Sequence, residues 1–529
     1  MLGFETKGKW AGAAIGLGLS CAAVGHWALG PSVPNGVAAE GAPAAGSPAG
    51  AGAAALDLQA ARHLLDRFAF GPRPGDPERV AGLGLEAWLA AELDATPLED
   101  AELGAALEPY RAALAPPSEL VEGWLGADAL TLGMDGRELN SKLEPYFRDH
   151  LANLALTILT RDVSSQRQLL EVMVDFWSNH FNVFAPKGLV RVFAGDYVER
   201  VLRPLALGRF EDLLVATARH PAMLVYLDNA TNSVQGGLNE NYARELLELH
   251  TLGVAGGYDQ NDVVNVARIL TGWSLTRPGQ PGTPLEFRFR AGRHDRGAKV
   301  VLGQGFPAGG GEGEGLRLLQ WLAHRPATAH HLATKLCRRF VADDPPASCT
   351  AAAERSYLES GGEIRAVLTA IVHDQSFWSV KTRGRKLKKP LELVASALRI
   401  CGARPDGTTQ LAQTLRRLGE PLLEESVPTG YPETEAEWAS SGGLLHRMSF
   451  ASDLGLGRLE GARVELANLL PDGAVDALLA RGNELFLSRG GGEQTLRAIR
   501  AELLLQPEPL ERRQLAAALF LGSPEFQRQ

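Results

Sequence analysis

Cysteine is scarce in this chain, and the residue patterns that mark common metal, nucleotide and hydrolase sites are missing. Only 4 of the 529 residues are cysteines, and no Cys-x-x-Cys pair or Cys/His cluster occurs, so a structural zinc site is disfavoured. The chain has no Gly-x-Ser-x-Gly elbow and no set of kinase loops. Gly303–Ala308 nearly matches a dinucleotide fingerprint, but Pro307 interrupts it and no helix follows directly, so we expect no nucleotide cofactor.

An excess of positive charge is also missing. The formal net charge is −9 and the isoelectric point is near 5.8, so the chain lacks the basic footprint of a nucleic-acid-binding protein. The apolar fraction of 45% and the charged fraction of 22% are those of an ordinary globular protein. The length allows a large core, and no fixed-period repeat indicates a solenoid.

An apolar run near the N-terminus has the layout of a signal peptide or an uncleaved signal anchor. It spans residues 10–29 behind two lysines, and small residues before Glu40 offer a cleavage site, so residues 1–39 are predicted to be the signal segment. Residues 40–55 are almost all Ala, Gly, Pro and Ser, which predicts a flexible linker. We therefore expect an exported protein, periplasmic or extracellular, that contacts a membrane only through its N-terminal segment.

The cysteines leave two questions open. Cys21 follows Leu19-Ser20 as in a lipoprotein cleavage box, but Gly18 stands where a branched apolar residue is wanted, so Cys21 is either lipidated or a small buried hydrophobe. Cys337 and Cys349 lie twelve residues apart and could form a disulfide in an oxidising compartment. Such a bridge would contribute about 3 kcal/mol by the loop-entropy account. Two buried thiols are the alternative.

Patterns of β-structure are rare, and helical periodicity dominates from residue 56 onward. We predict a mostly α fold with a single large multi-helical domain over residues 56–529. One β-hairpin insertion is expected at about 285–302, with Leu285–Phe289 paired to Lys299–Leu302. Asp259 is placed to cap the helix that follows it. Pro428–Pro432 marks an internal boundary candidate, but the helices beyond it are apolar enough to pack back on the main body.

The segment 166–184 predicts a helix that is buried on most sides, because apolar residues cover most of its circumference. Its polar remainder, Asp175, Asn179 and Asn182, falls on one face. These groups need partners, since an unpaired buried polar group costs about 1–3 kcal/mol. His180 lies in the apolar stripe, where it is either a core histidine bonded to a backbone carbonyl or a catalytic or ligand-binding residue.

The predicted helix 239–250 is crowded with charge on one side. That side carries Asn241, Glu240, Arg244, Glu245 and Glu248. On a solvated face, each Glu–Arg pair four residues apart would contribute only about 0.2–0.5 kcal/mol. Glu245 and Glu248, three apart, could instead share a proton or a divalent cation. At 100° per residue, His250 points away from both carboxylates, so this is not the helix of a zinc protease.

A further histidine lies at the predicted hairpin turn. His294-Asp295 comes just before Gly297. In one interpretation, Asp295 bonds the backbone of the turn. In the other, the loop presents His294 toward the charged helix.

Together, these motifs give the chain a family resemblance. The relevant segments are His63–Pro72, Phe176–Val183, His220–Asp228, Asn239–Val254, Ala267–Trp273, His294-Asp295, Lys335–Val341 and Ser523–Phe526. The chain resembles the domain-of-unknown-function 1800 family of exported bacterial proteins, in order over roughly residues 56–529. The resemblance implies a largely helical exported protein without a settled activity. It also implies frequent company with exported proteins of a phosphatase- or sulfatase-like fold, and it supplies no catalytic residue.

Two functional hypotheses follow. The first is a cell-envelope hydrolase or a ligand- or cation-binding protein, with catalytic candidates and substrate-binding candidates drawn from the segments above. The catalytic candidates are Glu245, Glu248, His180 and His294, and the substrate-binding candidates are Arg244, Asn241, Asn179 and Glu240. The alternative is a non-catalytic scaffold or secretion partner of another exported protein, whose charged cluster is a buried structural network.

Overall fold

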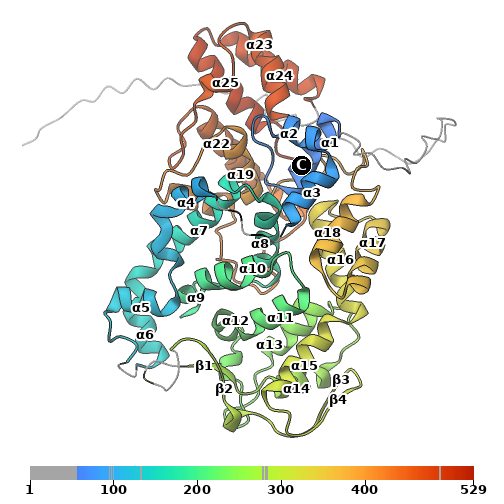
Figure 1. The fold of residues 1–529 in the computed structure, drawn as a ribbon. Helices are drawn as coiled ribbons and strands as arrows, with labels where there is room; N and C mark the ends of the chain where they lie inside the picture. Colours follow the sequence, from blue (N-terminus) through green and yellow to red (C-terminus); the bar gives the residue numbers. More distant parts are fainter. Residues whose placement is uncertain are drawn as a thin grey trace, which may run out of the picture. The chain divides into compact units, whose positions relative to one another are not determined.

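Helices follow one another along nearly all of the chain that the structure, a computed structural model, describes (Figure 1). It describes residues 56–529 except 95, 97, 99, 132–133, 277–278, 280–283 and 488–489. These residues belong to one compact unit. The mostly α prediction is confirmed. The predictions for the signal segment, the linker and Cys21 lie outside the described residues.

The N-terminal half is built from fourteen α-helices of the described chain. They are α1 (Leu58–Phe68), α2 (Asp76–Leu83), α3 (Leu85–Leu93), α4 (Ala101–Leu107), α5 (Pro117–Leu125), α6 (Gly136–Leu143), α7 (Phe147–Ser164), α8 (Gln168–His180), α9 (Val190–Asp196), α10 (Arg203–Leu205), α11 (Phe210–Arg219), α12 (Pro221–Tyr226), α13 (Asn241–Glu245) and α14 (Gln260–Ile269).

The C-terminal half continues with paired helices and ends in a group formed by α22 to α25 (Figure 1). Its helices are α15 (Glu312–Ala323), α16 (Pro326–Phe340), α17 (Ala347–Ser360), α18 (Ile364–His373), α19 (Pro390–Ile400), α20 (Gln410–Leu418), α21 (Glu435–Trp438), α22 (Ser441–Gly455), α23 (Val475–Phe486), α24 (Glu493–Leu505) and α25 (Pro509–Gly522). No helix among the described residues is both long enough and apolar enough to cross a bilayer.

Local signals explain where several helices begin. Asp57 caps α1 by accepting a hydrogen bond from the Ala60 amide at 2.7 Å. Asp259 caps α14 as predicted, and Asp262 bonds back to the Asp259 amide to complete a capping box. Cys337 of α16 and Cys349 of α17 are joined by a disulfide that ties these two packed helices together.

Four short strands form two separate antiparallel ribbons. β1 (Trp273–Leu275) pairs with β2 (Phe287–Phe289), and β3 (Lys299–Val301) pairs with β4 (Gln304–Phe306). The predicted hairpin is therefore wrong in its pairing, although both of its segments contain a strand. β3 turns at once into β4 through two residues with positive φ (48° at Leu302 and 80° at Gly303), a tight hairpin turn. The stretch that resembled a dinucleotide fingerprint is this turn and β4.

Candidate functional site

The polar side chains of α8 and of the residues just after it hydrogen-bond to a segment from much later in the chain. We call this segment, Glu420–Glu433, the strap. Asn179 donates from Nδ2 to the Tyr431 carbonyl at 3.0 Å and to a Glu433 carboxylate oxygen at 2.7 Å. Its own Oδ1 accepts from the Tyr431 amide at 2.6 Å. Asn182 donates to two strap carbonyls at 3.0 and 2.8 Å.

At Gly430 the strap packs so closely against α8 that no side chain fits between them. Gly430 has φ 74°, and a Cβ built there would lie 2.4 Å from the backbone oxygen of Asn179. Only glycine combines this backbone conformation with such a close approach. The boundary candidate at Pro428–Pro432 is therefore a packed part of the interior, and the amide of Asn179 is engaged in holding it.

A buried ionic cluster continues from the same face of α8. The Lys389 ammonium lies 3.3 Å from Asp175, 3.5 Å from Glu433 and 3.8 Å from Glu420. Burial raises the pKa of Asp175, and it raises the pKa of Glu420 to about 7, while Lys389 acts in the opposite direction on both. These contacts supply the partner that the sequence required for Asp175.

The other face of α8 meets the charged segment through histidines. α13 continues into η6 (Leu246–Thr251), a π-helical turn in which the Leu252 amide reaches the Leu247 carbonyl at 2.9 Å. His180 Nε2 lies 3.2 Å from the His250 carbonyl, and His331 Nε2 lies 3.0 Å from the Leu249 carbonyl. Since a carbonyl oxygen only accepts, both rings carry a proton on Nε2. Histidines of two other helices thus fix the wide turn.

His250 lies between these helices with 1% of its surface exposed, and neither ring nitrogen has a hydrogen-bond partner within the described chain. The ring centroids of His180 and His250 are 6.1 Å apart, and those of His180 and His331 are 6.2 Å apart. Burial, aided by the nearby Lys335 ammonium, lowers the pKa of His250 to about 3 and that of His331 to about 4. The pKa of His180 falls well below its usual value for the same reasons. All three imidazoles are neutral at pH 7.

Lys335 lies one turn beyond His331 on α16. Burial lowers its pKa to about 8, although Glu433 opposes the shift. His331 and Lys335 were not predicted as site residues. The signal available in the sequence was their spacing of four on one helix, which puts both side chains on the same face.

The carboxylate side of the charged segment is partly open to solvent. Arg244 Nη2 lies 3.3 Å from Glu240 and donates to Gln260 at 3.0 Å, with the two charged side chains 42% and 36% exposed. Burial first, and then the neighbouring Glu248, raise the pKa of Glu245. Within the described residues, no hydrogen bond or ion pair reaches the carboxylates of Glu245 or Glu248. Asn241, the remaining candidate on this side, is exposed.

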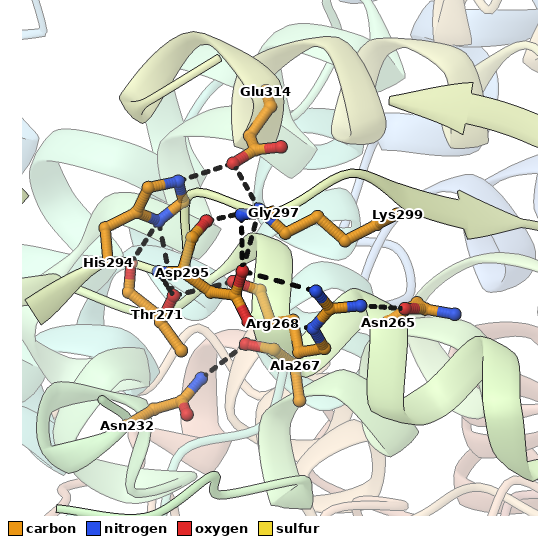
Figure 2. Close-up of polar contacts among 10 residues, drawn as sticks. All are labelled: Asn232, Asn265, Ala267, Arg268, Thr271, His294, Asp295, Gly297, Lys299 and Glu314. Atoms are coloured by element: carbon orange, nitrogen blue, oxygen red, sulfur yellow. Dashed lines mark hydrogen bonds and ion pairs between the residues drawn. The ribbon is translucent and has the colours of Figure 1, made fainter. Parts of the chain in front are cut away.

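His294 belongs to a different cluster, shown in Figure 2. Its Nδ1 lies 2.9 Å from the Thr271 carbonyl, and its Nε2 contacts Glu314 of α15. Lys299 Nζ lies 2.8 Å from the same Glu314 carboxylate, and these three side chains are at most 2% exposed. The interpretation in which the loop presents His294 to the charged helix is therefore not met, because Thr271, just after α14, and Glu314 of α15 engage the two ring nitrogens.

Asp295, next to His294, hydrogen-bonds both to a neighbouring arginine and to the backbone of its own turn. It accepts from the Gly297 amide at 2.8 Å, the backbone contact anticipated for a turn aspartate, and from Arg268 Nε at 2.8 Å (Figure 2). Arg268 and the Gly297 amide hold the pKa of Asp295 below its usual range. These contacts anchor the chain between β2 and β3 to Arg268 of α14.

The eight predicted site residues thus fall into three places. His180 and Asn179 are adjacent in α8 but bind different segments. Glu240 precedes α13, Asn241, Arg244 and Glu245 lie in it, and Glu248 follows in η6, whereas His294 lies in the buried cluster of Figure 2. In the part of the chain that is described, no group of three or more His, Cys, Asp or Glu side chains is arranged to hold a metal ion.

Comparison with known proteins gives one match. The sequence model of a family described as "Protein of unknown function (DUF1800)" matches residues 63–528, nearly the whole chain. No curated protein and no solved structure matches. The resemblance inferred from the sequence motifs is confirmed by this match.

Proposed function

Because the chain belongs to the DUF1800 family, whose description assigns no activity, we propose a function from the geometry of its own residues: a non-catalytic, partner-binding scaffold of the cell envelope. The observation that carries this proposal is the engagement of His180 and His294, two of the four catalytic candidates, in interior contacts. His294 and Lys299 both contact the Glu314 carboxylate, and the three side chains are at most 2% exposed. Such closed, buried charge networks are structural elements whose disruption costs about 3–5 kcal/mol.

Two further features support a place outside the cytoplasm. The N-terminal segment has the signal layout described above, and Cys337 is bonded to Cys349. Disulfides persist in oxidising compartments such as the periplasm. The partner we propose is an exported protein of phosphatase- or sulfatase-like fold, the kind of companion that the family resemblance implies.

The test is co-elution of two purified proteins. The full chain, in mild detergent, would be mixed with an exported phosphatase- or sulfatase-like protein from the same organism and run on a sizing column, with affinity measured by calorimetry. A stable complex with micromolar or tighter affinity is expected. Separate elution at all concentrations, combined with turnover of a hydrolase substrate by this chain alone, would overturn the proposal.

A second function is favoured by a specific observation, the half-buried and unpartnered pair Glu245 and Glu248. Two adjacent carboxylates can hold a divalent cation that keeps several waters, or act as an acid and a base in hydrolysis. Calorimetry with Mg²⁺ and Ca²⁺ would compare the parent with Glu245→Gln/Glu248→Gln. Glu119→Gln/Glu122→Gln is the matched control, because these carboxylates also lie three apart on one helix but are exposed. Loss of cation binding in the first variant alone would establish this function.

A further inference from the structure

A cavity of 250 Å³ lies away from all the groups described above. It is bounded by the turn between α1 and α2, by the end of α19 and by α23. Its charged lining consists of Arg62, Arg73, Arg481, Glu78 and Glu484, and prolines of the turn, Ile400 and Leu485 form its apolar wall. The cavity therefore combines three guanidinium groups with an apolar surface.

Only part of that positive charge is neutralised by neighbours. Arg481 Nη1 lies 3.0 Å from Glu484, so this pair is balanced. Arg62 has no hydrogen bond or ion pair within the described residues, although it is only partly exposed. Glu78 is exposed at the rim. Arg62 is thus an available cation in the wall.

The guanidinium of Arg73, which lines the cavity, lies close to that of Arg399. Arg73 Nη2 and Arg399 Nη1 both donate to the Val163 carbonyl, at 2.6 and 3.0 Å. The carboxylate closest to Arg399 is that of Asp76 at 3.5 Å, and Asp76 also pairs with Arg79 at 3.1 Å. Two cations therefore converge on one neutral oxygen, and Arg399 shares its carboxylate with Arg79. An anion placed in the cavity would relieve this repulsion.

We propose that this cavity binds a small organic oxyanion, a phosphate or sulfate monoester, with Arg62 and Arg73 contacting the anionic group. Guanidinium groups bind the oxygens of such anions through paired, charge-assisted hydrogen bonds. The prolines, Ile400 and Leu485 contact the organic part of the ligand. The volume is below the roughly 300–1,000 Å³ of typical small-molecule sites, which limits the ligand to a compact monoester.

The test is calorimetry on the full chain with phenyl phosphate, inorganic phosphate and acetate as probes. We expect phenyl phosphate to bind more tightly than inorganic phosphate and acetate not to bind. Arg62→Ala should weaken phenyl phosphate binding at least tenfold at an unchanged Tm, because Arg62 has no hydrogen bond or ion pair within the described residues. A parent protein that binds none of the probes would overturn the proposal.

Arg111→Ala is the control for non-specific charge attraction. Its side chain is 80% exposed and, among the residues that the structure describes, forms an ion pair only with Glu108, at 3.6 Å. Unchanged binding in this variant is expected. An equal loss of binding in Arg111→Ala and Arg62→Ala would also overturn the proposal, because the affinity would then follow net charge rather than the cavity.

Discussion

His180 of α8 hydrogen-bonds through Nε2 to the backbone carbonyl of His250, 3.2 Å away, and so holds the π-helical turn η6 in place. The sequence left two interpretations open for His180. This contact agrees with the first, a core histidine bonded to a backbone carbonyl. The bond joins two of the motifs that carry the family resemblance. Its removal leaves a buried carbonyl without a partner.

Replacing His180 by Leu should therefore destabilise the protein by about 1–3 kcal/mol, the usual cost of an unsatisfied buried polar group. Guanidinium denaturation would measure the loss. Faster amide hydrogen exchange confined to residues 246–252 would locate it. His446→Leu, at an exposed position of α22, is the control and should change neither quantity. Normal exchange in η6 of the His180 variant would contradict the assignment.

His250 should make stability depend on pH. Its pKa in the folded protein is about 3, against about 6.5 in the unfolded chain, so between these values the unfolded state binds the extra proton. Stability from this group is therefore complete above pH 6.5 and is lost as the pH falls toward 3. Glu420, whose pKa is raised to about 7, acts in the opposite direction above pH 4.5, so the parent curve contains both effects.

The variant His250→Leu isolates the histidine contribution. The difference in unfolding free energy between parent and variant should shift by about 1.4 kcal/mol per pH unit below pH 6. Urea titrations at pH 7.0, 6.0, 5.5 and 5.0 would measure it. A difference that stays constant over this range would show that His250 does not remain neutral in the fold.

Gly430→Ala should detach the strap. The added Cβ would meet the Asn179 backbone oxygen at 2.4 Å, and φ is 74°. Gly407→Ala is matched in backbone conformation, with φ 92°, but its Cβ would lie 3.9 Å from its nearest neighbour, Pro109. In both variants alanine must adopt a positive φ, and this cost is common to the two. The difference between their losses of unfolding free energy therefore reports the steric clash at residue 430, about 1–3 kcal/mol. Limited proteolysis should cut within residues 420–433 only in the Gly430 variant.

Glu314→Gln should be among the most damaging single changes, because it leaves Lys299 buried beside a neutral amide. We expect a loss of about 3–5 kcal/mol of unfolding free energy in denaturant titrations. Adding Lys299→Met should recover part of that loss. Glu240→Gln removes a carboxylate whose side chain is 36% exposed, and should cost less than about 1 kcal/mol. Equal effects at Glu314 and Glu240 would argue against a buried network.

Reduction of the Cys337–Cys349 disulfide should also lower stability. The bridge closes a loop of twelve residues, for which the loop-entropy account gives about 3 kcal/mol. Cys337→Ala/Cys349→Ala and dithiothreitol should produce the same fall in Tm. Cys401→Ala is the comparison, since Cys401 is a buried thiol outside the disulfide and its variant should remain sensitive to dithiothreitol.

The features that the sequence predicted correctly are those that depend on nearby residues. The apolar stripes of α8, its polar face and the cap at Asp259 all follow from spacings of a few positions. The partners of that polar face could not be predicted, because Tyr431 lies 252 residues from Asn179. The periodicity showed only that Asn179 needed a partner.

The missed features depend on contacts between distant segments. The π-helical turn needs His180 and His331 from two other helices to fix its carbonyls, so the sequence of residues 239–250 alone predicted an ordinary helix. Likewise, the strand segments were recognised by their alternation. Their partners, β1 for β2 and β4 for β3, were not predicted from that alternation.

The strap sets the order in which parts of the chain can finish folding. Because the polar face of α8 is satisfied by residues 420–433, that helix cannot be fully buried until more than four fifths of the sequence has left the ribosome. Contacts of such high sequence separation form slowly, since a long loop must close first. The last step in the folding of α8 is therefore the docking of the strap onto its polar face.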